Sequence, residues 1–502
     1  KAIVVNLYKE DDRTDPNNYR GIALLSCLGK LYLSLWARRL AGHAEGRLTD
    51  GQGGFRTRRS TVDQAIVLND VLRARKKEGK ATYVCFVDFR KAFDTVWHEG
   101  LWKRLWDSGV RGKPWRIIRY LYSSIHSQVR VGDKLTRPVR MRQGVRQGCP
   151  LSPVLFNYFV DALSEMLARS GHALSHGDRV AIHSLLYADD VALLADSPEA
   201  LQAQINVVDE FCRRWHMDIN LDKSKVMVVK GDVPLPSSLS FTCREAGLEI
   251  VSTYKYLGIH FAEDLTWDAN FDAIMDKAGW KTQSLRRLFN NNKIPARAKT
   301  LVWLAYVRPT LEYGSEVWTP SAQQAKKMET LQLEAGKKIF KVNMHMHNDA
   351  VRALMQVPTL ALRRDRAMMQ FYAKVKSMQR DRLVRQVIET SGRSSFYWLS
   401  RAKKLLELAT ASGDQAAEAL KSALSLLEAS AARNQGVLPL GLDPTSEWEG
   451  YAPLKHWKAA VAKWVARKNL QQFTGNRSTT CALLRRACEV EEDQEELEAM
   501  PR

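Results

Sequence analysis

The chain has 502 residues, of which 45% are hydrophobic and 26% charged, a globular composition too long for a single packed core. Its 76 lysines and arginines outnumber 55 aspartates and glutamates, and the net charge of +21 favours a phosphate-bearing partner, nucleic acid ahead of membrane. Seven scattered cysteines without a Cys-x-x-Cys pair argue against a secreted disulfide scaffold and predict a reduced, intracellular setting with no disulfide partner.

Short apolar runs alternate with helical patterns as far as about residue 265, which predicts a mixed α+β body. Strands are predicted from β-branched and aromatic runs bounded by Gly, Asp or Pro, at residues 2–8, 82–89, 128–131, 184–187, 191–194, 226–229 and 254–261. Helices are predicted at residues 28–41, 61–77, 101–108, 114–122, 153–168 and 198–215, three of them with proline in the first turn.

The rest of the chain reads as almost wholly helical, with a boundary near residue 262. Weaker interruptions fall at residues 344–349, 391–395 and 434–446. Residues 454–471 form a basic amphipathic pattern, either a nucleic-acid contact or a core stripe with a solvated face. Residues 489–498 are an acidic tail. No apolar run is long enough to cross a bilayer, so no membrane partner is expected.

Adjacent aspartates, Asp189 and Asp190, separate two apolar strands in the segment LLYADDVALL. A hairpin tip explains one such acid, but two ionised carboxylates between buried strands are costly unless a cation meets them. The second predicted strand carries its only acid, Asp88, near its end, on the face shared by Val84 and Phe86. If these elements lie side by side in one sheet, three carboxylates meet at one edge.

Three carboxylates at one sheet edge would offer oxygen ligands that suit Mg²⁺, with Mn²⁺ as the alternative ion. Such a cluster can hold two ions, which clamp the attacking and leaving oxygens of an in-line phosphoryl displacement. Three aspartates far apart in the sequence are a weak pattern by themselves, so the motifs around them decide.

The segments FVDFRKAFD at residues 86–94 and YADD at 187–190 resemble motifs A and C of reverse transcriptases, most closely those of non-LTR (LINE-type) retrotransposons. Further blocks follow in the family's order: KEDDRTDPNNYR at 9–20, DGQGGFRTRRSTVD at 50–63, GVRQGCPLSPVLF at 144–156, NLDKSKVM at 220–227 and YLG at 256–258. The resemblance implies a right-hand polymerase with three parts: fingers and palm with an antiparallel sheet at 1–262, a thumb-like helical region at 263–345, and a mostly helical region of unknown role at 346–502.

By this resemblance Asp88, Asp189 and Asp190 are the catalytic carboxylates that bind the metal ions. Lys223 is either a proton donor near the leaving pyrophosphate or a salt-bridged surface lysine. Ser224 stands where the family usually has threonine, and it keeps the hydroxyl group.

The resemblance also assigns the nucleotide site. Lys9 and Arg20 would contact the triphosphate, as a flexible point charge and a planar fork, although alone they would be surface charges. Phe93 would lie beneath the incoming sugar, where its ring excludes a 2′-hydroxyl and so favours deoxynucleotides; the alternative is a core aromatic. The nascent base pair would be contacted by a segment whose glycine permits close backbone approach, namely Arg146, Gln147 and Gly148.

Nucleic-acid contacts are expected in three places. Template contacts by backbone and stacking are expected from Gln52, Gly54, Phe55 and Arg56. The primer grip would be Tyr256, Leu257 and Gly258. Basic residues of the thumb-like region would contact phosphates or form a solvated face: Arg286, Arg287, Lys293, Arg297 and Lys299.

The implied function is an RNA-directed DNA polymerase, a nucleotidyltransferase that extends a DNA 3′ end on an RNA template by two-metal phosphoryl transfer. Its partners would be template RNA, a DNA primer or target DNA, and deoxynucleoside triphosphates. The alternatives are a catalytically silent RNA-binding remnant, which three intact aspartates disfavour, and a domesticated or group II intron type reverse transcriptase.

Two further expectations concern context. The chain begins inside a strand-like run at Lys1, which predicts a piece of a longer protein. Nuclear localisation, for a eukaryotic element, follows from the resemblance alone.

Overall fold

The computed structural model describes residues 2–411 apart from 10, 11, 124, 179, 233, 235–237 and 392–396, together with 418, 422 and 458–462. Of the C-terminal predictions, only residues 458–462 are described, as helix; the rest of 454–471, and all of 434–446 and 489–498, lie outside the described residues. Within the described part, no helix combines the length and apolar character needed to span a membrane.

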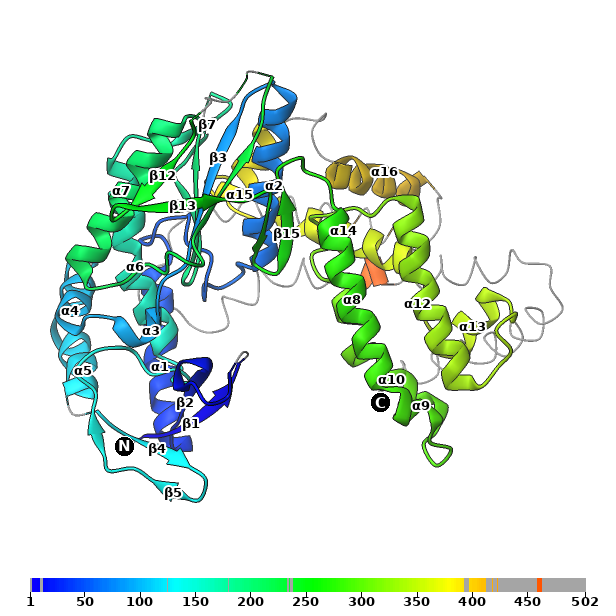
Figure 1. Ribbon diagram of the computed structural model, residues 1–502, viewed down its shortest axis with the longest axis horizontal. Coiled ribbons are helices and arrows are strands. Elements are labelled where there is room, and N and C mark those ends of the chain that lie inside the picture. The colour runs from blue at the N-terminus through cyan, green and yellow to red at the C-terminus, as the bar shows by residue number, and fades with distance from the viewer. Residues whose placement is uncertain are drawn as a thin grey trace.

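The main sheet has the strand order β12-β13-β11-β3-β10-β9, and every neighbouring pair is antiparallel except β11 with β13. Its strands are β3 (Thr82–Val87), β9 (Ser184–Tyr187), β10 (Asp190–Ala195), β11 (Lys225–Val229), β12 (Phe241–Cys243) and β13 (Ala246–Ile250). Figure 1 shows this sheet at the top of an arch of two arms.

A second sheet lies at the foot of one arm (Figure 1) and is built from β1 (Ala2–Tyr8), β2 (Tyr19–Leu24), β4 (His126–Val131), β5 (Lys134–Leu135) and β6 (Val139–Arg140). A short 3-10 turn, Pro16–Asn18, precedes β2. Two separate hairpins complete the strands: β7 (Leu174–His176) with β8 (Val180–Ile182), and β14 (Thr253–Tyr256) with β15 (Ile259–Ala262).

Helices of the first arm and the sheet region are α1 (Cys27–Ala44), α2 (Thr61–Lys77), α3 (Ala92–Thr95), α4 (His98–Asp107), α5 (Gly112–Ser123), α6 (Ser152–Arg169) and α7 (Pro198–Trp215). The second arm and its continuation contain α8 (Asp268–Ser284), α9 (Arg286–Asn290), α10 (Ala296–Tyr306), α11 (Arg308–Glu312), α12 (Ala322–Phe340), α13 (Asn348–Met355), α14 (Leu360–Lys376), α15 (Leu383–Thr390) and α16 (Tyr397–Ala411). The mixed α+β fold class is confirmed.

The main sheet is buried on both faces, because alternate residues of β3 enter different cores. Cys85 and Val87 pack with the apolar faces of α6 and α7. Val84 and Phe86 pack with α2 and with helices α14 to α16. This alternation is the one predicted from period two. Asp88 follows directly after the carboxyl end of β3.

The region after residue 345, whose role the sequence did not reveal, folds back against α2. Helices α15 and α2 are in contact. Lys374 on α14 pairs with Asp63, which also caps the N-terminus of α2 together with Ser60. Helices α14 to α16 therefore share one hydrophobic core with the main sheet.

The single strand predicted at 254–261 is wrong. The segment forms the hairpin β14–β15, reversed at Leu257 and Gly258, whose φ angles are 47° and 83°. Glycine adopts positive φ without steric cost, so the Leu-Gly pair marks the turn that the apolar pattern concealed.

Stability should fall on acidification in part through His43. Burial, and then the charge of Arg47, lowers the pKa of His43, whose ring shares a 2.8 Å hydrogen bond with the Tyr158 hydroxyl. A histidine with a folded-state pKa below its usual 6.5 takes up protons preferentially in the unfolded state, so stability is lost as pH falls through that window. Chemical unfolding at about pH 7.5 and about pH 5.5 should show that the free energy of unfolding falls less between these pH values in His43→Gln than in wild type. Equal losses would contradict this assignment.

Candidate active site

The three predicted carboxylates meet at one end of β3 and β10, two inner strands of the main sheet, and this end of the sheet is the candidate metal edge. Strand β10 begins at Asp190 and pairs with β3 so that Val191 lies opposite Val87. This antiparallel register brings Asp190 beside Asp88, and Asp189 precedes it in the turn from β9. The side-by-side arrangement required by the metal-site prediction is therefore present.

Desolvation, and after it the repulsion between neighbouring carboxylates, raises the pKa values of Asp190 and Asp88. Asp190 keeps exposed surface, yet desolvation by surrounding protein atoms, followed by the charges of Asp189 and Asp88, raises its pKa to about 6. Desolvation also raises the pKa of Asp88, against the opposing charges of Lys223 and Lys9 and a hydrogen bond from Asn220. The edge thus carries negative charge that nearby lysines offset in part.

The donor set fits Mg²⁺, because all three side chains offer carboxylate oxygens at an electronegative edge. Among the described residues, no group of three or more His, Cys, Asp or Glu side chains is gathered tightly enough to enclose a metal ion. Mg²⁺ is usually held by one or two carboxylates together with substrate phosphates rather than by an all-protein cage. Asp88, Asp189 and Asp190 are the residues that would hold it.

The backbone of Asp88 is fixed by the loop that precedes β11. The hydroxyl of Ser224 accepts a hydrogen bond from the backbone amide of Asp88 (3.1 Å). The backbone amide of Asn220 donates to the backbone carbonyl of Asp88 (2.8 Å). Serine therefore supplies the hydroxyl at this position without the methyl group of threonine. Lys223 is exposed and, among the ion pairs of the described residues, forms none.

The hairpin β1–β2 carries the two residues predicted to contact the triphosphate. Lys9 is exposed beyond the end of β1, and its charge reaches both Asp88 and Asp94. Arg20 is exposed on β2, opposite Leu7. Both cations therefore belong to the same hairpin, and Lys9 lies close to the candidate metal edge.

Phe93 is half-buried and held by two aromatic neighbours. Its ring stacks on Phe156 of α6, with centroids 4.6 Å apart and an interplanar angle of 14°, and meets Phe55 edge-on at 6.0 Å. One face of the Phe93 ring therefore packs as a core aromatic would, against Phe156. Asp94, the next residue, accepts a 3.4 Å hydrogen bond from the Gln147 amide.

The segment at 146–148 packs against β2. The Ala23 amide donates to the Gln147 carbonyl (2.8 Å), and a Cβ at Gly148 would lie 2.9 Å from the Ala23 carbonyl oxygen. The glycine therefore permits close approach to the protein's own backbone. The guanidinium of Arg146 lies 5.9 Å from the ring centroid of Tyr122.

The predicted template block divides into buried and exposed residues. Gln52 is fully buried and Arg56 is 8% exposed, with Arg56 paired to Glu45. Neither side chain lies where a template could stack on it, so burial argues against the predicted stacking contacts of these two residues, and backbone contacts of the segment stay a prediction. Phe55 and Arg58 are exposed, each with a left-handed backbone conformation.

The predicted primer grip adjoins the catalytic strands. The hydroxyl of buried Tyr256 donates to the Leu185 carbonyl (3.2 Å), and Tyr313 donates to the Leu257 carbonyl (2.7 Å). Tyr254 stacks on Phe86 of β3 at 4.1 Å. The turn at Leu257 and Gly258 is thus tied to β9 on one side and to the helical arm on the other.

Sequence reasoning assigned no role to several residues that the structure places at this site. Asn220 and Asp94 are polar neighbours of the candidate catalytic groups, and both lie within the quoted motif segments. Tyr313 lies in the second arm, too far along the chain to be associated with Leu257 by any local pattern. In that arm, Lys299 is wrongly placed among the phosphate contacts, because it is 3% exposed and donates to the Phe289 carbonyl.

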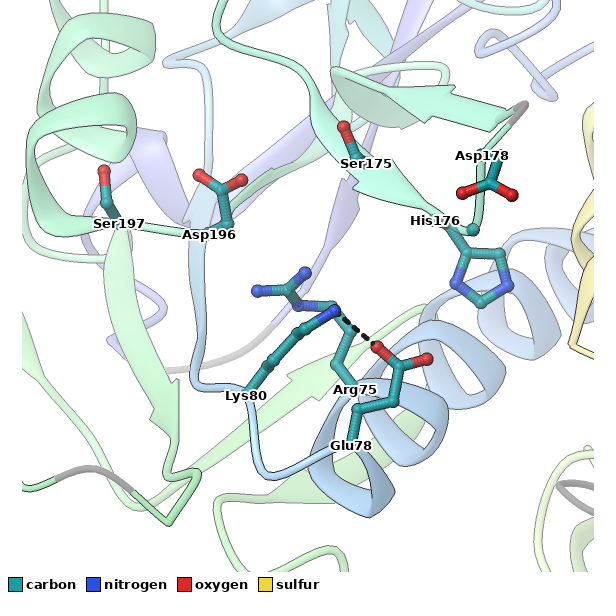
Figure 2. Close-up of a pocket in the computed structure, with 9 residues that line it drawn as sticks. Arg75, Glu78, Lys80, Ser175, His176, Asp178, Asp196 and Ser197 are labelled. Carbon is teal, nitrogen blue, oxygen red and sulfur yellow. Dashed lines mark hydrogen bonds and ion pairs between the residues drawn. The ribbon is translucent and has the colours of Figure 1, made fainter.

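A cavity of about 650 Å³ lies elsewhere, beside Asp196 at the end of β10 remote from Asp190 (Figure 2). Its lining carries both signs of charge, including the pair between Lys80 and Glu78 at 2.9 Å. None of the predicted site residues lines it. The predicted carboxylates Asp88, Asp189 and Asp190 therefore lie outside this cavity.

Comparison with known proteins gives the family to which this chain belongs. Residues 8–261, half of the chain, match the reverse transcriptase (RNA-dependent DNA polymerase) family. The chain belongs to this family.

Curated relatives are encoded by mobile elements. The probable RNA-directed DNA polymerase from transposon BS of Drosophila melanogaster is 29% identical over 61% of this chain and 34% of its own length. The Pol polyprotein from the type-1 retrotransposable element R2 of Popillia japonica is 32% identical over 50% of this chain and 36% of that relative. The RNA-directed DNA polymerase from mobile element jockey of Drosophila funebris is 26% identical over 72% and 39%. The resemblance to non-LTR retrotransposon enzymes is confirmed, and the chain spans about a third of these relatives.

Proposed function

We propose that the chain is the polymerase portion of a non-LTR retrotransposon protein, and that it extends a DNA 3′ end along an RNA template. The observation that carries this proposal is the convergence of Asp88, Asp189 and Asp190 at one sheet edge, within a chain of the reverse transcriptase family. Its substrates would be deoxynucleoside triphosphates, with template RNA and a DNA primer or target DNA as partners. The net charge of +21 supports a polyanionic partner. A nuclear location in a eukaryotic host belongs to the same proposal.

The chemistry would be in-line phosphoryl transfer. Bound Mg²⁺, as two ions, would lower the pKa of the primer 3′-hydroxyl and neutralise charge on the triphosphate. Lys9 supplies positive charge on the side of Asp88 and Asp94, where an incoming triphosphate would be drawn. Lys223, exposed and without an ion pair among the described contacts, can donate a proton to the leaving pyrophosphate.

Primer extension tests this function directly. Purified protein is incubated with Mg²⁺, deoxynucleotides and a DNA primer annealed to an RNA template, beside reactions that lack template or contain a chelator. Template-directed DNA made only in the complete reaction supports the proposal. A folded protein that binds the primed RNA but makes no DNA would instead support the silent RNA-binding alternative.

Phe93 is expected to select the sugar. Its ring is braced from one side by Phe156, so it cannot retreat from a 2′-hydroxyl without losing that stacking. Phe93→Ala should lower the preference for deoxynucleotides over ribonucleotides, measured as a ratio of kcat/KM values, by about tenfold or more. Phe340→Ala, which removes another partly buried ring on α12, should leave the ratio unchanged. An unaltered ratio in Phe93→Ala would identify Phe93 as a core residue only.

A further inference from the structure

The turn between β9 and β10 has an unfavourable backbone conformation. Ala188, which separates Tyr187 from Asp189, has φ of 60° and is 5% exposed. This left-handed region is disfavoured for alanine because its Cβ crowds the following carbonyl. Surrounding contacts must therefore hold the turn, and with it the direction in which Asp189 leaves the chain.

Gln52 makes those contacts. Its side chain is fully buried, and its Oε1 accepts hydrogen bonds from the amides of Ala188 (3.1 Å) and Gly54 (2.7 Å). Its Nε2 faces the Ala188 carbonyl at 3.5 Å. The side chain of Gln52 thus contacts both the backbone N–H and the backbone carbonyl of Ala188.

The segment that carries Gln52 is itself firmly placed. The Gly53 amide donates to the Leu186 carbonyl (2.7 Å), and the Leu186 amide donates to the Gly51 carbonyl (3.0 Å). These bonds add the segment to β9, the edge strand of the main sheet. The side-chain amide of Asn157, on α6, donates to the Gly54 carbonyl (2.8 Å). The backbone that carries Gln52 is thus held in place beside β9 and α6.

We propose that Gln52 is a positioning residue of the polymerase site, whose buried amide holds the turn at Ala188 and thereby aims Asp189 and Asp190. This inference rests on the proposed function, because the same carboxylates carry the reaction. Gln52 touches neither substrate nor metal; it acts through the turn.

The test compares two glutamines that are equally buried. Gln52→Met keeps the length of the side chain and removes its hydrogen bonds. Gln204→Met does the same for a fully buried glutamine whose amide donates to the Leu194 carbonyl (2.9 Å), toward the other end of β10. The amplitude of the first-turnover burst gives the concentration of active sites, and the steady-state rate divided by it gives kcat per active site. Hydrogen–deuterium exchange is followed in the peptide spanning 184–195 without substrate or metal.

Gln52→Met should lower kcat per active site by about a hundredfold, since small misplacements of reacting groups have effects of this size. KM for deoxynucleotides and affinity for primed template should change by less than about threefold, and exchange around Ala188 should accelerate. Gln204→Met should show neither the kcat loss nor faster exchange at the turn. A Gln52→Met kcat within about threefold of wild type, or an equal loss in Gln204→Met, would overturn the proposal.

A double-mutant cycle tests the link to Ala188. Glycine adopts positive φ without strain, so Gln52→Met should cost a smaller factor in kcat in the Ala188→Gly background than in wild type. If Gln52→Met reduces kcat by the same factor in both backgrounds, Gln52 does not act through the backbone of Ala188 and the proposal is overturned. If Gln52→Met does not fold, Gln52→Asn, one methylene too short to reach the turn, takes its place. If wild type makes no DNA, the proposed function fails, and hydrogen exchange at the turn still decides whether Gln52 holds it.

Discussion

Replacing Asp189 by alanine should reduce template-directed DNA synthesis by about a thousandfold or more, while the affinity for primed RNA stays close to that of wild type. Asp189 follows the left-handed turn and is exposed at the edge shared with Asp88 and Asp190. Its removal leaves the sheet intact but takes away a carboxylate that would hold Mg²⁺. The loss should therefore appear in the rate constant of the chemical step, measured by single-turnover primer extension.

The matched control is Asp196→Ala, which removes an exposed aspartate just beyond the other end of β10. It changes net charge by the same amount and should keep primer extension within about threefold of wild type. If both variants lose activity equally, or if Asp189→Ala retains it, the sheet edge is not the catalytic centre.

Gly54→Ala should lower kcat by about a hundredfold by pushing the catalytic turn aside. A Cβ at this position would lie 2.2 Å from the Ala188 amide nitrogen, 2.9 Å from the Ala188 Cα and 3.0 Å from the Tyr187 carbonyl carbon. These are backbone atoms, so no side-chain rotation can relieve the overlap and the two segments must separate. The same substitution should cost about 1–3 kcal/mol in the free energy of unfolding.

Gly42→Ala provides the comparison, because a Cβ added at Gly42 of α1 meets nothing within 4 Å. That variant should be more stable by about 0.5–1 kcal/mol, since alanine favours helix over glycine, with an unchanged kcat. Thermal unfolding and single-turnover kinetics measure both effects. A Gly54→Ala protein with wild-type kcat would show that the turn tolerates displacement.

The sequence determined the local elements and the identity of the acids. Helix α2 spans the predicted residues 61–77, and β3 alternates between two cores as period two requires. The adjacent aspartates marked a hairpin tip, and the ordered motifs indicated the family. These features follow from spacing and steric preference within a few residues, which is information that the chain carries locally.

The tertiary structure decided which polar groups pair inside the protein and which remain outside. Gln52 and Arg56 lie in a motif that suggests template contact, yet both are buried by strands and helices distant in sequence. Lys299 is withdrawn from the surface by the Phe289 carbonyl, and Lys374 ties α14 to Asp63. The pairing of a buried polar group depends on which remote backbone atoms packing brings within hydrogen-bond reach, and no local pattern records that distance.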